Sequence, residues 1–188
     1  MTLSDADDVA PGPWIETARL ILRPTAMSDF PRWAEMMGDP EASRFLGGPQ
    51  APEAAWRGMM TMAGAWALTG FAMFSLIERD TGLWLGRVGP WQPLGWPGTE
   101  VGWGLHPDAH GKGYALEAAI ASLDYAFDVL GWTEVIHCID PENRPSQVLA
   151  ERLGSRNMGP TRLPPPFQDV AVDRWGQTRE QWAARAQG

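Results

Sequence analysis

Hydrophobic and polar positions follow two different periods along the chain. Alternation typical of half-buried strands predicts six β-strands, at residues 19–25, 71–79, 83–89, 99–107, 134–140 and 167–175. Hydrophobic residues spaced three and four apart predict helices at residues 28–38, 52–68, 115–130 and 146–154. The order of these elements predicts one α/β (α+β) domain, because neither an internal repeat nor a linker interrupts it.

Composition narrows the class of protein. We expect a single domain over residues 14–188, preceded by an acidic, disordered lead-in over residues 1–13. The net charge of −8 argues against a protein that tracks nucleic-acid phosphates. The chain shows no targeting signal and no apolar run long enough to cross a membrane, so we expect a cytoplasmic protein with no membrane partner.

The hexapeptide His-Gly-Lys-Gly-Tyr-Ala, residues 110–115, lies between a predicted strand and a predicted helix. Gly111 and Gly113 permit close backbone approach, and the start of the following helix offers unpaired N–H groups and a positive dipole end. These features favour a phosphate site. The segment does not match the nucleotide P-loop, since Gly113 is followed by Tyr114, and it lacks the Gly-x-Gly-x-x-Gly pattern of dinucleotide folds. A plain connecting turn is the alternative.

The hexapeptide resembles the acyl-CoA signature of the GNAT N-acetyltransferase superfamily, Gln/Arg-x-x-Gly-x-Gly/Ala, with His110, Gly113 and Ala115 at its defining positions. The segments "TARLILRPTAMSDF", "DTGLWLGRVG", "NRPSQVLAERLG" and "TREQW" resemble the ribosomal-protein N-terminal acetyltransferase (Rim-type) branch, and the likeness spans roughly residues 15–183. Two departures are His110 in place of Gln or Arg, and Ser155 where an aromatic residue is common.

This resemblance implies a mixed, mostly antiparallel sheet flanked by helices. Its fourth and fifth strands, residues 99–107 and 134–140, splay apart, and acetyl-CoA lies between them. The resemblance implies that the pyrophosphate is held by backbone amides of His110, Gly111, Lys112, Gly113, Tyr114 and Ala115. Pantetheine pairs with the backbone of Leu105 and His106, and the Leu105 N–H polarises the thioester. Lys112 is either a phosphate contact or a solvated turn residue.

Two residues are candidates for catalysis. Glu100 on the fourth strand is the candidate base for the attacking amine, directly or through water, against the alternative of a solvated strand carboxylate. Ser146 matches the Rim-type serine near the sulfur and is the candidate proton donor to the CoA thiolate, although it also reads as the N-cap of its helix. Asn143, from the family's Asn-x-x-Ser, contacts pantetheine or fixes the loop.

The cysteine and the histidines do not indicate a covalent intermediate or a metal site. Cys138, the only cysteine, lies on an apolar strand without an activating base and reads as core rather than as a nucleophile. The histidines at 106, 110 and 137 lack metal-ligand spacing, so we expect no metal. Among eleven tryptophans, Trp91, Trp96 and Trp103 are expected to border the acceptor pocket, together with residues 44–50, where aromatic faces receive a cation.

Two functional classes follow from the sequence. The first is an acetyl-CoA-dependent N-acetyltransferase acting on a primary amine, either a protein N-terminus or a small molecule, by direct attack in a ternary complex. The second is a non-catalytic acyl-CoA sensor or partner-binding protein of the same fold. The presence of both Glu100 and Ser146 favours the enzyme. A phosphate-binding module unrelated to CoA is disfavoured by the ordered motifs, and either a monomer or a homodimer is compatible with the sequence.

Overall fold

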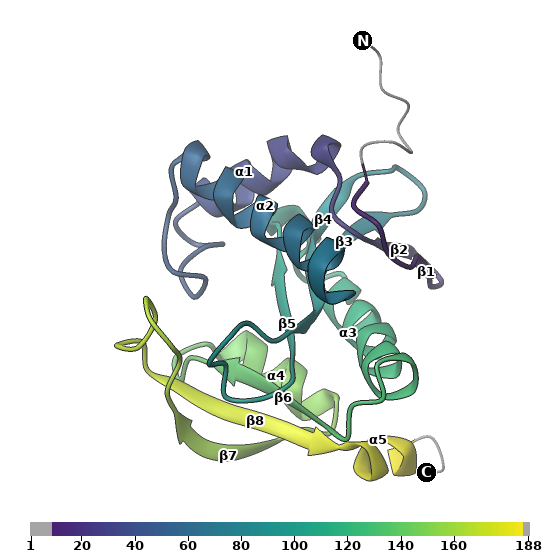
Figure 1. The fold of residues 1–188 in the computed structure, drawn as a ribbon, viewed down its shortest axis with the longest axis vertical. Coiled ribbons are helices and arrows are strands. Elements are labelled where there is room, and N and C mark those ends of the chain that lie inside the picture. Colours follow the sequence, from purple (N-terminus) through teal and green to yellow (C-terminus); the bar gives the residue numbers. More distant parts are fainter. Residues whose placement is uncertain (1–8, 186–188) are drawn as a thin grey trace.

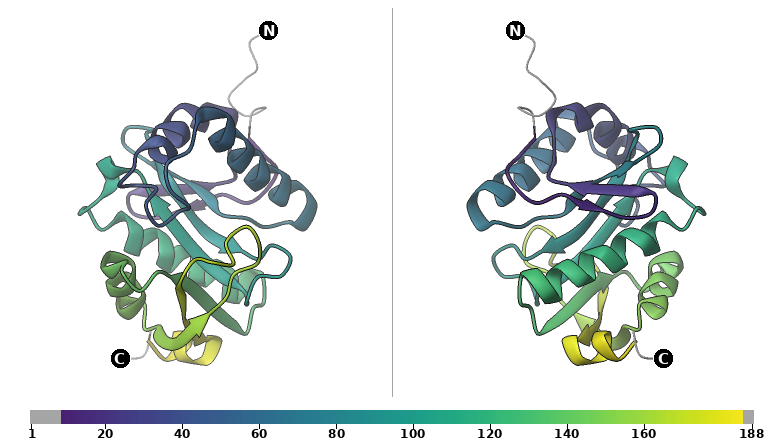
Figure 2. Two further views of the ribbon diagram at one scale, coloured as in Figure 1. Left: turned by 90° about the vertical axis from the view of Figure 1, so that its left-hand side faces the viewer. Right: turned by 90° about the vertical axis from the view of Figure 1, so that its right-hand side faces the viewer.

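The computed structural model describes residues 9–185, which form a twisted eight-stranded sheet with helices on both faces (Figure 1). Views from the two sides show α1 and α2 on one face and α3 on the other (Figure 2). The strands are β1 (Ile15–Glu16), β2 (Leu20–Arg23), β3 (Phe74–Glu78), β4 (Trp84–Trp91), β5 (Glu100–Leu105), β6 (Glu134–Ile139), β7 (Arg156–Thr161) and β8 (Val172–Thr178). The helices are η1 (Met27–Asp29), α1 (Phe30–Gly38), α2 (Pro52–Thr69), η2 (Pro107–Ala109), α3 (Tyr114–Asp124), η3 (Tyr125–Val129), α4 (Arg144–Arg152) and α5 (Arg179–Arg185).

The strand order β1-β2-β3-β4-β5-β6-β8-β7 contains one parallel pair, β5 with β6. All other neighbours are antiparallel. The parallel pair has a single register position, Glu100 opposite Ile136, whereas β4 and β5 pair over six positions. The strands β5 and β6 therefore separate soon after they meet. They correspond to the predicted fourth and fifth strands, because the short β1 was not expected from the sequence.

Side chains on β4 and β5 divide between the two faces of the sheet. Residues directly opposite each other on paired strands share a face, and successive residues alternate. One face carries Arg87, Gly89, Trp91, Glu100, Gly102 and Gly104. This is the face covered by α1 and by the segment that leads to α2, because Arg87 stacks on Trp33 of α1 and Gly104 approaches Leu46. The other face carries Val101, Trp103 and Leu105.

The hydrophobic core is nearly continuous across the sheet. Its largest fully buried side chains come from both helical layers and from the strands between them: Trp33, Phe74, Phe127, Leu20, Leu22, Met36, Met59, Leu76, Leu85, Leu123, Ile136 and Leu153. The predicted apolar stripes on α1, α2 and α3 supply much of this core. Burial of these stripes against the sheet is what fixes the helices beside β4 and β5.

Several predicted elements differ from the structure. The chain near the N-terminus has defined contacts before Trp14, because Val9 forms a bridge with Ala26, while residues 1–8 of the expected lead-in lie outside the described part. The helix predicted over 115–130 is α-helical only to Asp124 and continues as a π-helix. The last strand begins at Val172 rather than 167, and the expected polar tail forms α5. No helix within residues 9–185 is long and apolar enough to span a bilayer.

Candidate active site

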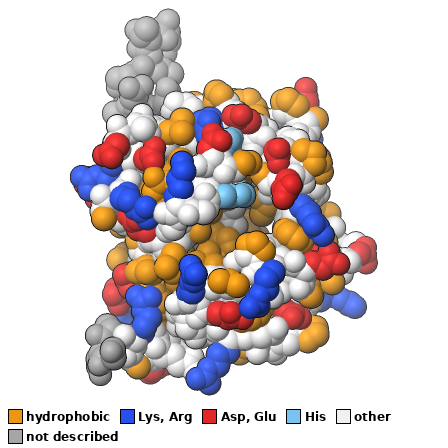
Figure 3. All heavy atoms as spheres, turned by 180° about the vertical axis from the view of Figure 1, so that it is seen from behind, with side chains coloured by type: hydrophobic (Ala, Val, Ile, Leu, Met, Phe, Trp, Pro, Cys, Tyr) orange, Lys and Arg blue, Asp and Glu red, His pale blue; other side chains and the backbone are white. Residues whose placement is uncertain are grey.

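The site is built around the point where β5 and β6 diverge. The Ile136 N–H donates to the Thr99 carbonyl at 2.8 Å, and Glu100 opposite Ile136 is the single register position of the β5–β6 pair. Seen from behind, the molecule has a hollow lined by hydrophobic side chains, with Lys and Arg side chains around it (Figure 3). A ligand can therefore enter between two halves of one sheet.

Glu100 lies at this divergence point and is only 6% exposed. Its Oε1 accepts the Cys138 N–H of β6 at 3.0 Å, and its Oε2 accepts the indole N–H of Trp96. Burial raises the pKa of Glu100 to about 7, and the hydrogen bonds from Cys138 and Trp96 offset only part of that shift. The carboxyl group can therefore exchange a proton near neutral pH, as an acid–base catalyst must.

Backbone groups of β5 line the space between the diverging strands. In an antiparallel pair, alternate residues direct their N–H and C=O groups toward the same neighbour. The His106 N–H donates to the Leu85 carbonyl of β4 at 2.8 Å, so Leu105 and Trp103 direct theirs away from β4 toward β6. The Leu105 carbonyl accepts the His110 Nε2–H at 3.1 Å, which leaves the Leu105 N–H facing the space.

The expected backbone role of His106 is wrong. Its N–H is bound to Leu85, and its carbonyl accepts the Ala109 N–H at 2.9 Å. The His106 side chain is buried and lies 3.0 Å from the guanidinium of Arg32. Neither backbone group of His106 is left for pantetheine, whereas Trp103 has the same backbone orientation on β5 as Leu105.

A buried polar chain connects β8, the residue before β7, β6 and β5. The Gln177 side-chain amide donates to Ser155 Oγ at 3.0 Å, Ser155 lies 2.9 Å from His137 Nε2, and His137 Nδ1 lies 2.7 Å from the Val101 carbonyl. A carbonyl only accepts, so Nδ1 carries the proton and Nε2 accepts from the Ser155 hydroxyl. Burial lowers the pKa of His137 to about 4 and keeps it neutral. The chain holds the two strands at a fixed separation.

Ser155→Ala is expected to lower the free energy of unfolding by about 1–3 kcal/mol, because it leaves the buried Nε2 of His137 without a donor. Gln177 keeps its second acceptor, the Leu153 carbonyl. Urea unfolding at neutral pH measures the change, with Thr61→Ala on the exposed surface of α2 as the control. Equal stability of the Ser155 variant and the wild type would contradict this view of the polar chain.

The glycine-containing turn opens onto the wide end of the divergence. Gly111 and Gly113 have φ of 72° and 80°, in the left-handed region that favours glycine. No atom lies within 4 Å of the Cβ position of Gly111, and Gly113 is the N-cap of α3. Arg19 donates to the Lys112 carbonyl at 2.9 Å, so this oxygen already has a partner. The turn and the start of α3 therefore fit a pyrophosphate.

The side chains of Lys112 and Tyr114, both in the expected acyl-CoA signature, have different surroundings. Lys112 is exposed, with its ammonium available to an anion. The Tyr114 hydroxyl donates to Glu78 at 2.5 Å, so only the backbone amide of Tyr114 can serve the site. Arg19, which the sequence analysis did not single out, also forms an ion pair with Glu117 of α3 at 2.7 Å. It fixes the turn relative to β2, a contact between positions far apart in the sequence.

Ser146 lies in the first turn of α4, on the face of the sheet opposite Glu100. The Trp103 indole N–H donates to Ser146 Oγ at 3.0 Å, which leaves the hydroxyl proton of Ser146 free to donate. The expectation that Ser146 caps its helix is wrong. Asn143 is the N-cap, and its Oδ1 accepts the Ser146 N–H at 3.2 Å. Asn143 therefore fixes the loop, one of its two expected roles.

Loops close the site on the face that carries Glu100. A Cβ at Gly47, between α1 and α2, would lie 3.5 Å from Phe167 in the β7–β8 loop. A Cβ at Gly95, in the β4–β5 loop, would lie 3.4 Å from Pro164. An ion pair of 2.9 Å joins Arg44 to Glu142 on the loop before α4. Four segments distant in sequence are therefore joined in pairs on this side of the sheet.

The sheet separates the three tryptophans that were expected to border the acceptor pocket. Trp91 lies directly opposite Glu100 and on the same face, and Trp96 bonds to the Glu100 carboxylate. Trp103 is on the other face, where its ring packs against His137 with centroids 4.8 Å apart. The structure therefore brings Trp91 and Trp96 together with Glu100 and separates Trp103 from them.

Cys138 does not have the properties of a nucleophile. Burial and the adjacent Glu100 carboxylate raise the pKa of its thiol, so the thiol stays protonated at neutral pH. Within residues 9–185, no group of three or more His, Cys, Asp or Glu side chains is placed to hold a metal ion.

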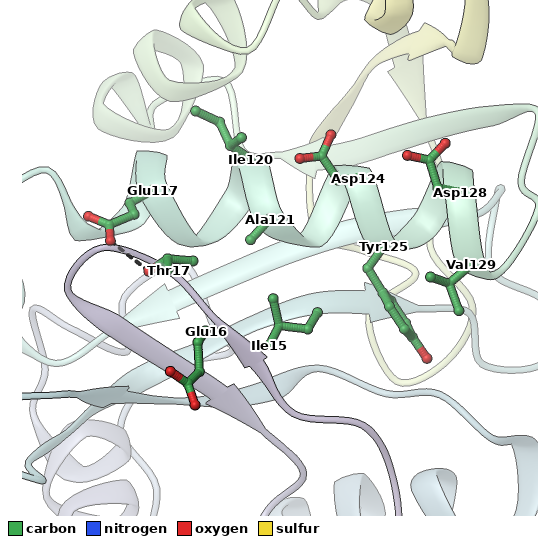
Figure 4. A pocket seen from close by; sticks show the side chains of 10 residues that line it. All are labelled: Ile15, Glu16, Thr17, Glu117, Ile120, Ala121, Asp124, Tyr125, Asp128 and Val129. Atoms are coloured by element: carbon green, nitrogen blue, oxygen red, sulfur yellow. Dashed lines mark hydrogen bonds between the residues drawn. The ribbon is translucent and has the colours of Figure 1, made fainter.

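A separate shallow pocket of about 530 Å³ lies between the β1–β2 hairpin and α3 (Figure 4). Its lining is Ile15, Glu16, Thr17, Glu117, Ile120, Ala121, Asp124, Tyr125, Asp128 and Val129, none of which is an expected site residue. The carboxylates here all have partners. Glu16 forms an ion pair with Arg79, Glu117 with Arg19 and Asp128 with Arg179, and Asp124 accepts the indole N–H of Trp182. The contacts of Glu117, Asp124 and Asp128 fasten α3 and the π-helix after it to the start of β2 and to the C-terminal elements, whereas Glu16 joins β1 to the end of β3.

The comparison with known families agrees with this geometry. The family model described as an acetyltransferase (GNAT) domain matches residues 19–156, which include the divergence point, the glycine turn and Ser146. The chain belongs to the GNAT acetyltransferase family. It is thus an enzyme of the N-acetyltransferase class, with the mixed α/β fold of that family.

Named relatives support the same assignment. The uncharacterized N-acetyltransferase YnaD of Bacillus subtilis is 29% identical over 151 residues, covering 77% of this chain and 84% of YnaD. An acetyltransferase structure from Agrobacterium tumefaciens has a TM-score of 0.78 at 32% identity, covering 89% of this chain and 95% of its own. The ribosomal-protein-S5-alanine acetyltransferase structure from Vibrio fischeri has a TM-score of 0.69 at 16% identity, covering 90% and 98%, which shows a shared GNAT fold.

Proposed function

We propose that this GNAT protein transfers an acetyl group from acetyl-CoA to a primary amine by direct attack in a ternary complex. The observation that carries the proposal is the position of Glu100. A buried carboxyl group with a pKa of about 7 lies where β5 and β6 separate, between a backbone-lined space and a loop-covered face. The domain over residues 14–188 is the catalytic unit in this proposal.

Acetyl-CoA supplies the activated acetyl group. The amides of residues 110–115 and the first turn of α3 bind its pyrophosphate, and Lys112 contributes an exposed positive charge. The backbone of Trp103 and Leu105 pairs with pantetheine along the open side of β5. The Leu105 N–H then faces the thioester oxygen, where it stabilises the charge that develops during attack.

Glu100 takes the proton of the attacking amine. The carboxylate form is needed, so activity rises as pH increases through about 7 and the fraction of ionised Glu100 grows. Trp91 and Trp96 border the acceptor on this face. On the opposite face, the free hydroxyl proton of Ser146 is directed to the departing CoA sulfur, because its oxygen already accepts from Trp103.

Trp96→Phe is expected to move the acid limb of the kcat/KM profile to higher pH. The Trp96 hydrogen bond lowers the pKa of Glu100, so its removal raises that pKa above about 7. The ionised base then forms only at higher pH. Initial rates between pH 5.5 and 9 measure the shift, with Trp56→Phe on α2 as the control. An unchanged acid limb would show that the indole does not stabilise the catalytic carboxylate.

Direct attack is favoured over an acetylated enzyme because the Cys138 thiol is protonated and already lies against Glu100. The acyl-CoA sensor is the second candidate, but it does not account for a titrating Glu100 facing Trp91 and Trp96. The Rim-type motifs and the fold likeness to the Vibrio fischeri structure make protein N-terminal amines one acceptor class, and small-molecule amines are the other.

Release of CoA thiol tests the proposal. The purified protein is incubated with acetyl-CoA and, separately, peptides with free N-termini, polyamines, aminoglycosides and amino carboxylates. Thiol release that depends on one of these amines and saturates with it is the expected result. Saturable acetyl-CoA binding without release for any amine would favour the sensor instead.

A further inference from the structure

Arg19 joins the turn between β1 and β2 to the glycine turn, residues 110–113, and to the first turn of α3. Its Nη1 group donates to the Lys112 carbonyl at 2.9 Å, and its Nε–H donates to Glu117 Oε2 at 2.7 Å. The backbone N–H of Arg19 donates to Glu117 Oε1 at 2.8 Å. The guanidinium also lies over the Tyr114 ring, 4.5 Å from its centroid. One side chain therefore contacts three positions at the end of the site where the pyrophosphate is proposed to bind.

Glu117 brings a negative charge to this end of the site. Its side chain is 17% exposed and lies in the first turn of α3, where the helix offers its unpaired N–H groups. It also accepts the Thr17 hydroxyl at 2.6 Å (Figure 4). Partial burial raises the pKa of Glu117, but the hydrogen bonds from Thr17 and Arg19 outweigh it and hold the pKa below its ordinary value. The group is therefore a carboxylate at neutral pH, and its charge repels a phosphate.

The guanidinium of Arg19 balances the charge of Glu117. Because one guanidinium spans both Glu117 and the Lys112 carbonyl, the carboxylate is too close to the glycine turn for salt to screen its charge fully. Without Arg19, an anion that enters the turn would meet an uncompensated carboxylate. The ion pair therefore preserves the positive end of α3 as a site for an anion.

The bond to Lys112 fixes the orientation of one peptide unit in the turn. The C=O and N–H of a trans peptide point in opposite directions, so Arg19 directs the Gly113 N–H away from itself when it holds the Lys112 carbonyl. Within residues 9–185, the Gly113 N–H has no hydrogen-bond partner. Glycine adopts many backbone conformations, so the turn needs a fixed point to present this N–H in one direction.

We propose that Arg19 is a positioning residue for acetyl-CoA, which holds the Gly113 N–H in place for the pyrophosphate and neutralises Glu117. The role rests on the proposed binding of acetyl-CoA at residues 110–115. The thioester is proposed to lie at Leu105, away from these contacts. Arg19 therefore sets the affinity for acetyl-CoA and not the rate of the chemical step.

Calorimetric titration of the full chain with acetyl-CoA tests this role. Arg19→Met should weaken binding by about 10- to 30-fold, because two charge-assisted hydrogen bonds that shape the site are lost. Arg19→Lys keeps a positive charge beside Glu117 and should bind with intermediate affinity. The double variant Arg19→Met/Glu117→Gln should bind at least about threefold more tightly than Arg19→Met, because the uncompensated charge is gone.

Arg179→Met is the matched control and should keep wild-type affinity for acetyl-CoA. The Arg179 side chain is 49% exposed, against 47% for Arg19, and it pairs with Asp128 in the π-helix that continues α3. Its loss changes the net charge by the same amount at the far end of that helix. With an accepted amine, Arg19→Met should raise KM for acetyl-CoA and leave kcat within about twofold of the wild type, the pattern of lost binding alone.

Wild-type affinity in Arg19→Met would overturn the positioning role. So would a double variant that binds no better than Arg19→Met, since Arg19 would then contact the phosphate directly or act only on stability. Equal losses of kcat and kcat/KM in Arg19→Met would place Arg19 in the chemical step and contradict the role as well. Arg19-dependent binding of acetyl-CoA with no thiol release from any amine would instead keep the role and refute acetyl transfer.

Discussion

Glu100→Gln is expected to lower kcat for acetyl transfer by about 10²- to 10⁴-fold, because the amide cannot take the proton of the attacking amine. The substitution keeps a carbonyl oxygen for the Cys138 N–H, so the link between β5 and β6 is retained. The affinity for acetyl-CoA should stay the same, since Glu100 does not contact the proposed pyrophosphate site. Steady-state kinetics and calorimetric titration measure the two effects separately.

Glu53→Gln in the exposed first turn of α2 is the matched control and should retain wild-type kcat. The wild-type rate should fall as pH decreases below about 7, because the raised pKa of Glu100 makes the protonated, inactive form dominant there. The residual rate of Glu100→Gln should not show this decrease at low pH. A Glu100→Gln variant with near wild-type kcat would show that Glu100 is not the catalytic base.

Gly113→Glu is expected to weaken acetyl-CoA binding by on the order of 100-fold. Gly113 has φ of 80°, which a glutamate adopts only with strain, and the new carboxylate would occupy the start of α3 in competition with a phosphate. Its Cβ would also lie 3.5 Å from Arg19, which orients the turn. Calorimetric titration with acetyl-CoA measures the loss of affinity.

Gly82→Glu provides a control for backbone strain, because Gly82 has φ of 69° in the open turn between β3 and β4. It should lose stability and keep its affinity for acetyl-CoA. Comparable weakening of acetyl-CoA binding in both variants would mean that general destabilisation, rather than the phosphate site, explains the effect.

Elements with a clear period could be predicted from the sequence. The stripes that bury Trp33 and Met59 marked α1 and α2, and the alternation through residues 99–107 marked β5. Strand β7 was missed because its residues are mostly exposed and include Gly159 and Pro160, which lack strand propensity. It forms because β8 provides a pairing edge, a tertiary cause that no local pattern reveals.

The candidate site could be predicted only where a motif or a strand position indicated it. Glu100 lies where β5 and β6 diverge and the glycine turn precedes α3, and their roles stay predictions. Asn143 rather than Ser146 caps α4, because either residue of Asn-x-x-Ser can serve as a cap. His137 looks like an ordinary strand residue in the sequence. Its contact with the Val101 carbonyl depends on which backbone groups of β5 face β6.

The most direct test of acetyl transfer is a measurement of initial rates with acetyl-CoA and an accepted amine both varied, while free CoA thiol and acetylated amine are quantified together. Our account predicts equimolar products and intersecting double-reciprocal lines, because both substrates must be bound before Glu100 removes the proton. Parallel lines with an acetylated protein, or thiol release without acetylated amine, would contradict direct transfer in a ternary complex.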